Sequence, residues 1–182
     1  MRTLLISLVQ SINGSYAQDD WSTGVSTDAD FAYFKGLRRQ AGAIVIDRRT
    51  ALNPQLPVIN APGKAMADTP VHVLTGSDST VLAAELEARG LNYQAHHFTP
   101  DTIAEVLEGI ECRSDTILCE SGPHLAYRLL DSYPNAQLHL SMSPLYSRNP
   151  GSHFCRLDAD IDLRLDGVES RDGQVFIRYS KA

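Results

Sequence analysis

Short apolar runs alternate with longer amphipathic stretches through most of this chain. The amphipathic stretches show the 3.6-residue period of helices, and the apolar runs have the length of buried strands. Because strands that alternate with helices form parallel sheets covered on both faces, the pattern predicts an α/β fold with a mostly parallel central sheet. The predicted strands are Thr3–Val9, Ala43–Ile46, Val71–Leu74, Tyr93–Phe98, Thr116–Cys119 and Gln137–Met142.

Capping residues indicate where the helices begin and end. Thr27 or Asp28 caps the first predicted helix, and Gly42 ends it before the next strand. Asp78 is expected to cap the helix Thr80–Arg89, and Gly90 ends it. Thr99 is expected to cap a later helix whose first residue is Pro100. Apolar residues on one face of each helix are expected to pack against the sheet. In the first helix these residues are Phe31, Phe34, Leu37 and Ala41.

Three segments depart from this alternation. Residues 11–27 form a long polar loop, and the stretch Asn53–Pro70 contains four prolines, which excludes regular structure. Apolar and polar residues then alternate strictly over Leu157–Leu165, and a second alternating run follows the turn at Asp172 and Gly173. This last pattern predicts a C-terminal antiparallel hairpin at one edge of the sheet.

The composition narrows the range of functions. With 43% hydrophobic residues among 182, the chain can bury the core of one domain, residues 1–182, without a metal or disulfide. The net charge is -6, and Lys and Arg do not cluster among aromatic residues, so no nucleic-acid partner is expected. The apolar run Leu4–Val9 is too short to span a membrane. A small molecule is the expected ligand.

Cysteine and histidine positions do not suggest a metal site. Cys112, Cys119 and Cys155 are an odd number without metal-ligand spacing, which favours free thiols in a reducing cytoplasm. His96 and His97 lie on one predicted strand and face opposite sides of it, so they are not expected to share a metal. No targeting segment is recognisable, and we expect a cytoplasmic protein.

The stretch TILCESGPHLAYRLL, Thr116 to Leu130, is the most informative, because an apolar strand leads directly into a helix. The free amides and positive dipole end of a helix N-terminus favour an anion. Gly122 permits close backbone approach, and Pro123 suits the first helical position. The junction predicts a phosphate site, and hence a nucleotide cofactor, although the same residues also fit an ordinary strand-to-helix turn. A serine-hydrolase site is disfavoured, because glycine is missing two positions before Ser121.

The loop SINGSYA, residues 11–17, directly follows the first strand. Sheets of this kind bind ligands outside the carboxyl ends of their strands, and small residues there would let a flat cofactor ring lie against the backbone. Taken alone, Asn13-Gly14 is a turn signal. The loop becomes a candidate site through its position in the chain.

Several stretches, taken in order, resemble a known family. They are VQSINGSYA, Trp21, FKGLRRQAGAIVIDRRTALNPQLP, TPVHVLTGS and ILCESGPHLAYRLL. Together they resemble the reductase domain of the riboflavin-biosynthesis deaminase/reductases, which has a dihydrofolate-reductase-like fold, over roughly residues 4 to 150. The resemblance implies an NADPH-dependent reductase, usually a homodimer, that acts on a ribosylaminopyrimidine.

The resemblance also implies roles for individual residues. Val9 and Trp21 would flank the nicotinamide, while Arg38 and Glu120 would bind the substrate. Asn13 stands where the family has a loop aspartate. The other cofactor contacts would be Thr50, Ser121, Gly122, Pro123, His124 and Leu125 around the diphosphate, and Thr75, Gly76 and Ser77 around the adenosine 2′-phosphate.

The chain departs from the family pattern at several positions. Asn13 cannot serve as a general acid, Ser121 replaces one glycine of Glu-Gly-Gly-Pro, and residues 47–50, DRRT, replace a small turn that contains glycine. Near Ile59, where the family often has an arginine for the substrate phosphate, this chain has none, although Arg48 or Arg49 could substitute. The cofactor half of the resemblance is therefore the stronger half.

These observations predict hydride transfer from NADPH to a C=N or carbonyl carbon of a small heterocyclic or ribosylamino substrate. The substrate would lie in a cleft that is bounded by Arg38, by Glu120 and by the loop that begins at Ser11. Arg38 would orient an acidic group, and Glu120 and Asn13 would hydrogen-bond the substrate. Two alternatives remain open: a pterin or dihydrofolate-type reductase of the same fold, and a nucleotide-binding relative without turnover.

Overall fold

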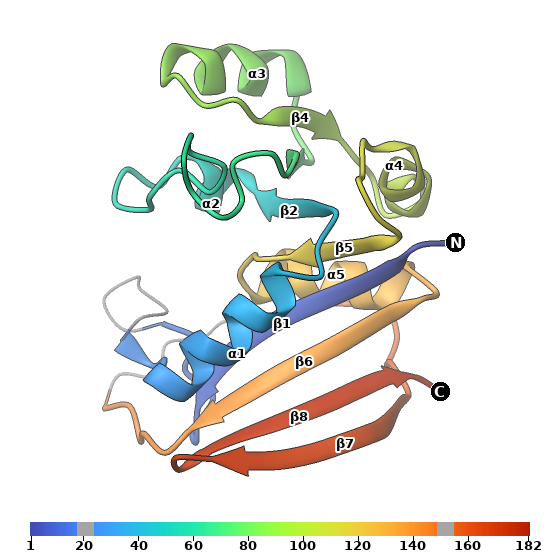
Figure 1. Cartoon of the computed structure of the whole chain (residues 1–182). Coiled ribbons are helices and arrows are strands. Elements are labelled where there is room, and N and C mark those ends of the chain that lie inside the picture. Colours follow the sequence, from blue (N-terminus) through green and yellow to red (C-terminus); the bar gives the residue numbers. More distant parts are fainter. Residues whose placement is uncertain (18–23, 149–154) are drawn as a thin grey trace.

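The computed structural model describes residues 1–17, 24–148 and 155–182, and these contain one eight-stranded sheet (Figure 1). Its order is β4-β3-β2-β5-β1-β6-β8-β7. Among these strands β8 alone runs antiparallel to its neighbours β6 and β7, which confirms the predicted fold class. The strands are β1 (Thr3–Ser11), β2 (Ala43–Asp47), β3 (Val71–Thr75), β4 (Gln94–His97), β5 (Thr116–Cys119), β6 (Ala136–Ser143), β7 (Leu163–Arg171) and β8 (Gln174–Lys181).

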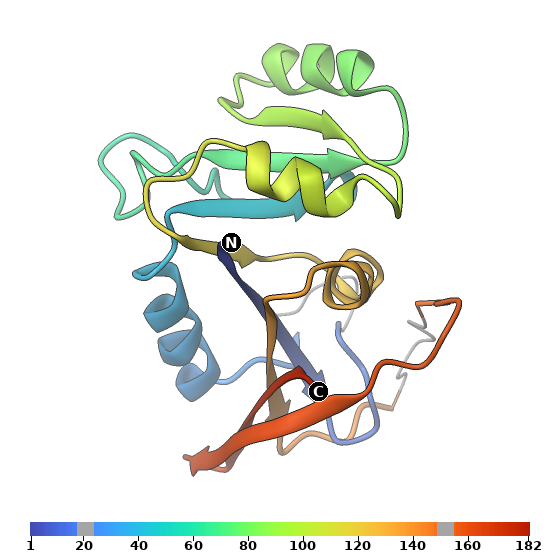
Figure 2. The same ribbon diagram turned by 90° about the vertical axis from the view of Figure 1, so that its right-hand side faces the viewer.

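Helices cover both faces of the sheet. The three helices α1 (Asp28–Arg38), α2 (Arg48–Ala51) and α3 (Ser79–Ala88) contribute to one core cluster. The other cluster contains residues of α4 (Ile103–Gly109) and α5 (Pro123–Ser132). Figure 2 shows α1 and α5 on opposite sides of the sheet. Successive side chains of a strand alternate between the two faces, so each central strand supplies both clusters.

The central strand β5 lies between β1 and β2 and ends before both of them. Its last residue, Cys119, pairs with Ile6 of β1 and Val45 of β2, whereas β1 continues to Ser11 beside β6. The chain leaves β1 toward α1 on one face and leaves β5 toward α5 on the other. Adjacent parallel strands with connections on opposite faces form a topological switch point, where α/β sheets bind ligands.

The predicted caps of α1 and α3 are confirmed. Thr27 Oγ1 accepts a hydrogen bond from the Asp30 amide at 3.2 Å, and Asp78 Oδ1 accepts one from the Thr80 amide at 2.8 Å. However, α1 ends at Arg38 and does not reach Ala41. Phe31 is 52% exposed, so it does not face the core as predicted.

The predicted start of α4 at Pro100 is wrong, because a separate turn precedes the helix. The Thr99 carbonyl oxygen accepts hydrogen bonds from the amides of Thr102 and Ile103, each at 3.1 Å. The Thr99 amide donates to Thr102 Oγ1 at 2.9 Å. The helix itself begins at Ile103.

The first hairpin strand also begins later than predicted. Pairing starts at Leu163, opposite Lys181, so residues 157–162 lie outside the sheet despite their alternating pattern. An irregularity between Leu165 and Gly167 then shifts the register, and Leu165 is 55% exposed instead of facing the core. Alternation predicts a strand only where a partner strand is present to pair with it.

Gly42 packs closely against the turn that precedes β5. A Cβ at this position would lie 2.2 Å from the Ser114 amide nitrogen. We therefore predict that Gly42→Ala lowers the free energy of unfolding by about 1–3 kcal/mol, measured by urea denaturation. The control is Gly109→Ala, since a Cβ there meets no atom within 4 Å. Equal stability of the Gly42→Ala variant and the wild type would contradict the close approach.

Two buried histidines of the sheet have polar partners. His72 Nδ1 lies 2.9 Å from His96 Nε2, and His72 Nε2 donates to the Glu111 carbonyl oxygen at 2.8 Å. His139 Nδ1 lies 2.6 Å from the Tyr33 hydroxyl. Burial lowers the pKa of both His72 and His139 to about 4. Both histidines are therefore neutral in the folded protein near pH 6.

We predict that the protein loses stability as the pH falls from 6.5 to about 4. The unfolded chain binds a proton on His72 near pH 6.5, whereas the folded protein does not bind it until the pH is near 4. His72→Gln should reduce this slope by up to about 1.4 kcal/mol per pH unit in urea denaturation. The control is His97→Gln, which replaces an exposed histidine of the same sheet. An unchanged slope for His72→Gln would rule out this contribution.

Candidate functional site

Most of the predicted site residues lie at the carboxyl edge of the sheet (Figure 1). The parallel strands β1, β2, β3 and β5 all end at this edge. The segments that follow them are residues 11–17, α2, the turn after β3 and the start of α5. Residues far apart in the sequence are thus brought to one side of the sheet.

The junction between β5 and α5 has the predicted form. Gly122 is the N-cap and Pro123 follows it as the first helical residue, and no side chain caps the helix. The first-turn amides of such a helix lack intrahelical partners, and its dipole adds positive potential. Gly122 and His124 are exposed, and a Cβ on Gly122 would meet no atom within 4 Å. This helix N-terminus is therefore open and suited to an anion.

A hydrogen-bond chain joins this junction to β2. The Asp47 amide donates to Ser121 Oγ at 2.7 Å, and Asp47 Oδ1 accepts from the Thr50 amide at 2.7 Å. Asp47 thereby caps α2, a helix that the hydrophobic pattern did not predict because four residues show no period. Ser121, where the resembled family has glycine, is buried and connects the end of β2 with the end of β5.

Arg38 and Glu120 form a two-point ion pair. Arg38 Nε donates to Glu120 Oε1 at 2.7 Å, and Arg38 Nη2 donates to Oε2 at 2.6 Å. The guanidinium also lies 4.6 Å from the ring centroid of Phe34. Their side-chain exposures are 28% and 8%. Burial raises the pKa of Glu120, while the hydrogen bonds from Arg38 act in the opposite direction.

Tyr93 belongs to the same neighbourhood, although no sequence pattern marked it as a site residue. Its hydroxyl accepts a hydrogen bond from the Ile59 amide at 2.9 Å. Burial raises the pKa of Tyr93, and the charges of Glu120 and Arg38 act on it with opposite signs. The proline-containing segment after α2 is therefore anchored near the ion pair. No local pattern connects Tyr93 with Ile59, so only the fold could reveal this contact.

The loop after β1 is attached to two other elements. The Asn13 side chain makes two hydrogen bonds with the backbone of Ser147, at 2.8 and 3.0 Å. The Tyr16 hydroxyl lies 2.8 Å from the Tyr127 hydroxyl of α5. Burial, with the hydrogen bond to Tyr127, raises the pKa of Tyr16. The predicted nicotinamide loop and the predicted diphosphate helix are therefore neighbours.

The remaining predicted cofactor residues are less closely grouped. Thr75 ends β3, where its Oγ1 accepts a hydrogen bond from the Ser77 amide at 3.1 Å, and both Gly76 and Ser77 are exposed. This turn is separated from β5 by the whole of β2. Val9 is half-buried on β1. Trp21 lies outside the described residues.

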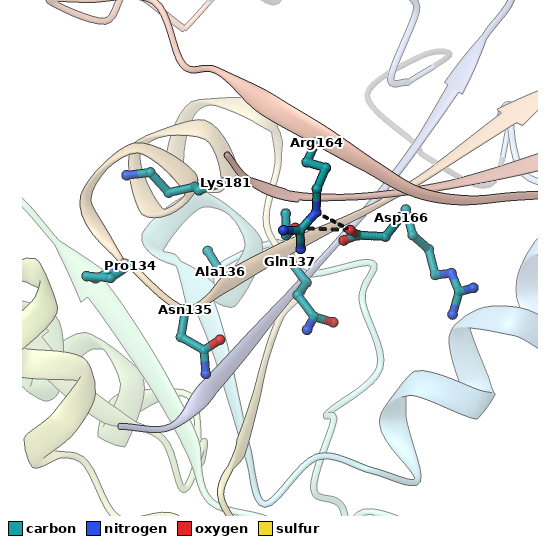
Figure 3. Close-up of a pocket in the computed structure, with 9 residues that line it drawn as sticks. Pro134, Asn135, Ala136, Gln137, Arg164, Asp166 and Lys181 are labelled. Atoms are coloured by element: carbon teal, nitrogen blue, oxygen red, sulfur yellow. Dashed lines mark hydrogen bonds and ion pairs between the residues drawn. The ribbon is translucent and has the colours of Figure 1, made fainter.

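A cavity of about 510 Å³ lies at the opposite, amino edge of the sheet, between the start of β6, the start of β7 and the end of β8 (Figure 3). Gln137, Arg164, Asp166 and Arg178 are among its lining residues, and Arg164 pairs with Asp166 at 3.1 Å. None of the predicted site residues lines it. This cavity is distinct from the candidate site.

The described part of the chain offers neither a metal-ligand cluster nor a membrane-spanning helix. No group of three or more His, Cys, Asp or Glu residues there could hold a metal ion. All three cysteines are free thiols, as their odd number suggests. None of the described helices is long and apolar enough to cross a membrane.

The architecture is that of the dihydrofolate-reductase-like fold, which includes reductases of riboflavin biosynthesis. A pyrimidine reductase-like protein from Corynebacterium diphtheriae superposes with a TM-score of 0.68 at 18% identity, covering 100% of this chain and 92% of that protein. A dihydrofolate reductase from Enterococcus faecalis, complexed with NADP(H), gives 0.60 at 13% identity, with 98% and 96% covered. The fold implied by the sequence resemblance is confirmed.

A longer protein from Thermotoga maritima is matched over part of its length. It is a diaminohydroxyphosphoribosylaminopyrimidine deaminase and 5-amino-6-(5-phosphoribosylamino)uracil reductase, with a TM-score of 0.65 at 11% identity. The match covers 100% of this chain and 57% of that protein. No family model and no curated protein matches the sequence. The likeness therefore establishes the fold.

The ion pair gives a prediction for stability. Arg38→Ala leaves the Glu120 carboxylate buried without its partner, which costs about 3–5 kcal/mol in a fully buried pair and less here, because Arg38 is partly exposed. We expect a loss of about 2 kcal/mol in urea denaturation. A double-mutant cycle with Glu120→Gln should give a coupling above about 1 kcal/mol.

The matched control is the exposed pair Arg48–Glu85, which has a 2.8 Å contact and side-chain exposures of 45% and 38%. Its double-mutant cycle should give less than about 1 kcal/mol. Equal coupling energies in the two cycles would contradict the special contribution of the buried pair.

Proposed function

We propose that this chain is an NADPH-dependent reductase that transfers hydride to a ribosylaminopyrimidine-type substrate, as in riboflavin biosynthesis. The observation that carries the proposal is the open N-terminus of α5 beside the loop after β1, at the switch point of the sheet. Bound NADPH would supply the hydride. The residues of this chain would bind and orient the reactants and shape the electrostatic field around them.

The cofactor would lie along the carboxyl edge. Its diphosphate would bind the backbone amides of Ser121, Gly122, His124 and Leu125. Pro123, which has no N–H group, and Thr50 would lie beside it. The nicotinamide would lie beside Val9, the loop after β1 and Trp21. The 2′-phosphate would meet the turn formed by Thr75, Gly76 and Ser77, where backbone amides and hydroxyls are suitable donors. The exposed, uncapped helix start fits such a group.

On the substrate side we assign Arg38 and Glu120. Since each neutralises the other, the pair offers hydrogen-bond donors and acceptors to a substrate without a net charge. This suits the edge of a neutral heterocycle, whereas an acidic group would have to compete with Glu120 for Arg38. The pair would hold the substrate ring so that its reactive carbon faces the nicotinamide.

The structural neighbours support this proposal. One is a pyrimidine reductase-like protein, one includes a 5-amino-6-(5-phosphoribosylamino)uracil reductase, and one is a dihydrofolate reductase complexed with NADP(H). The last of these also favours a second candidate, a pterin-type reductase. Consumption of NADPH with aminopyrimidine or with pterin substrates distinguishes the two. A homodimer and a cytoplasmic location complete the proposal.

The cofactor site can be tested with Gly122→Asp. Aspartate is a good N-cap and favours the helix dipole, so this variant should fold at least as stably as the wild type. Its carboxylate would repel the cofactor diphosphate, and NADPH affinity should fall by at least ~10-fold in a fluorescence titration.

Asn92→Asp adds the same charge at an exposed position and serves as the control, with unchanged affinity. The proposal fails when wild-type protein does not bind NADPH, or when Gly122→Asp binds it as tightly as the wild type does.

A further inference from the structure

The side chain of Asn13 makes a two-point contact with a single residue of another loop. Its Nδ2 donates to the Ser147 carbonyl oxygen at 2.8 Å, and its Oδ1 accepts from the Ser147 amide at 3.0 Å. Oδ1 also accepts from Ser11 Oγ at 2.9 Å. Both polar atoms of the Asn13 side chain are therefore engaged within the protein.

A side-chain amide fits this contact, whereas an ionised carboxylate does not. An amide carries a donor and an acceptor side by side, which matches the N–H and C=O of one backbone residue. An ionised aspartate has acceptors only, so one of its oxygens would face the Ser147 carbonyl oxygen without a proton between them. Asparagine at position 13, where the resembled family has aspartate, therefore suits the contact with Ser147.

The contact continues the pairing of two strands beyond their ends. β1 and β6 are parallel neighbours whose last paired residues are Ser11 and Ser143. Beyond them, the Ile12 amide donates to the Leu145 carbonyl oxygen at 2.9 Å, and the Asn13–Ser147 contact follows. Ser147 is 6% exposed, so these hydrogen bonds are partly shielded from water.

The same loop is held at a second point. The Ser15 amide donates to Ser11 Oγ at 2.9 Å, which closes the turn around Gly14, where φ is +80°. Tyr16 then meets Tyr127 of α5. Asn13 therefore fixes the loop to the segment that follows β6, and Tyr16 fixes it to α5, the proposed diphosphate helix.

We propose that Asn13 is a positioning residue: through Ser147 it holds the loop after β1 in the shape that receives the nicotinamide half of the cofactor. This inference rests on the proposed function for the identity of the cofactor. It assigns no proton transfer to Asn13. The hydrogen bonds through which Asn13 holds the loop are present without the cofactor.

The test compares Asn13→Asp, Asn13→Ala and the charge control Asn92→Asp in the full chain. Hydrogen exchange of peptides that contain Ile12 and Ser147 measures whether the loops stay joined. NADPH titration, KM and kcat over a range of pH measure the consequence for the cofactor. The substrate in the kinetic assay is an aminopyrimidine.

Both Asn13 variants should exchange these amides faster and bind NADPH ~10-fold more weakly, as expected for the loss of about one net hydrogen bond. The KM for NADPH should rise more than kcat falls, and the pH profile of kcat should keep its shape. Asn92→Asp should match the wild type in every measurement.

Wild-type exchange and affinity in both Asn13 variants would overturn the proposal. A new pH dependence or a gain in kcat for Asn13→Asp would overturn it too, because position 13 would then act on the substrate. If the wild type does not bind NADPH, the proposed function fails and the cofactor role of Asn13 fails with it. Hydrogen exchange then still decides whether Asn13 joins the two loops.

Discussion

The early end of β5 is the constraint on which the rest of the carboxyl edge depends. Cys119 is buried and paired on both sides, with Ile6 and with Val45, so the strand end cannot shift without breaking the centre of the sheet. Immediately beyond it, Glu120 turns to the face that carries α1, and the chain then enters α5 on the other face. One buried strand end thus determines the positions of both the ion pair and the open helix N-terminus.

Polar contacts between elements then complete the arrangement. The Asp47 amide binds Ser121 and so joins β2 to the start of α5, and Arg38 joins α1 to the end of β5. Hydrogen bonds of this kind contribute about 1 kcal/mol each and are costly to break when one partner stays buried. They act together because they converge on Glu120 and Ser121, the two residues directly after β5. This makes the edge a preorganised surface, which ligand binding and catalysis both favour.

The sequence predicted the architecture well because the alternation of strands and helices is a local signal. Pro123 at a helix start and Gly90 after a helix were read from single residues, and both have the predicted roles. The errors arose where a nonlocal partner decides the outcome, as at Leu163, where the pairing with β8 begins. At the site, the family resemblance identified Arg38 and Glu120 as candidates. Their pairing across 82 residues, and that of Asn13 with Ser147 across 134, could not be read from any local pattern.

The central claim is that the amides at the start of α5 and the loop after β1 together receive NADPH. Backbone amide NMR during an NADPH titration tests it most directly, because each amide reports on its own surroundings. The account predicts saturable shifts that are largest at Gly122, His124 and Leu125 and at Ser15 and Tyr16. An absence of saturable shifts, or shifts confined to the amino-edge cavity around Gln137 and Arg178, would contradict it.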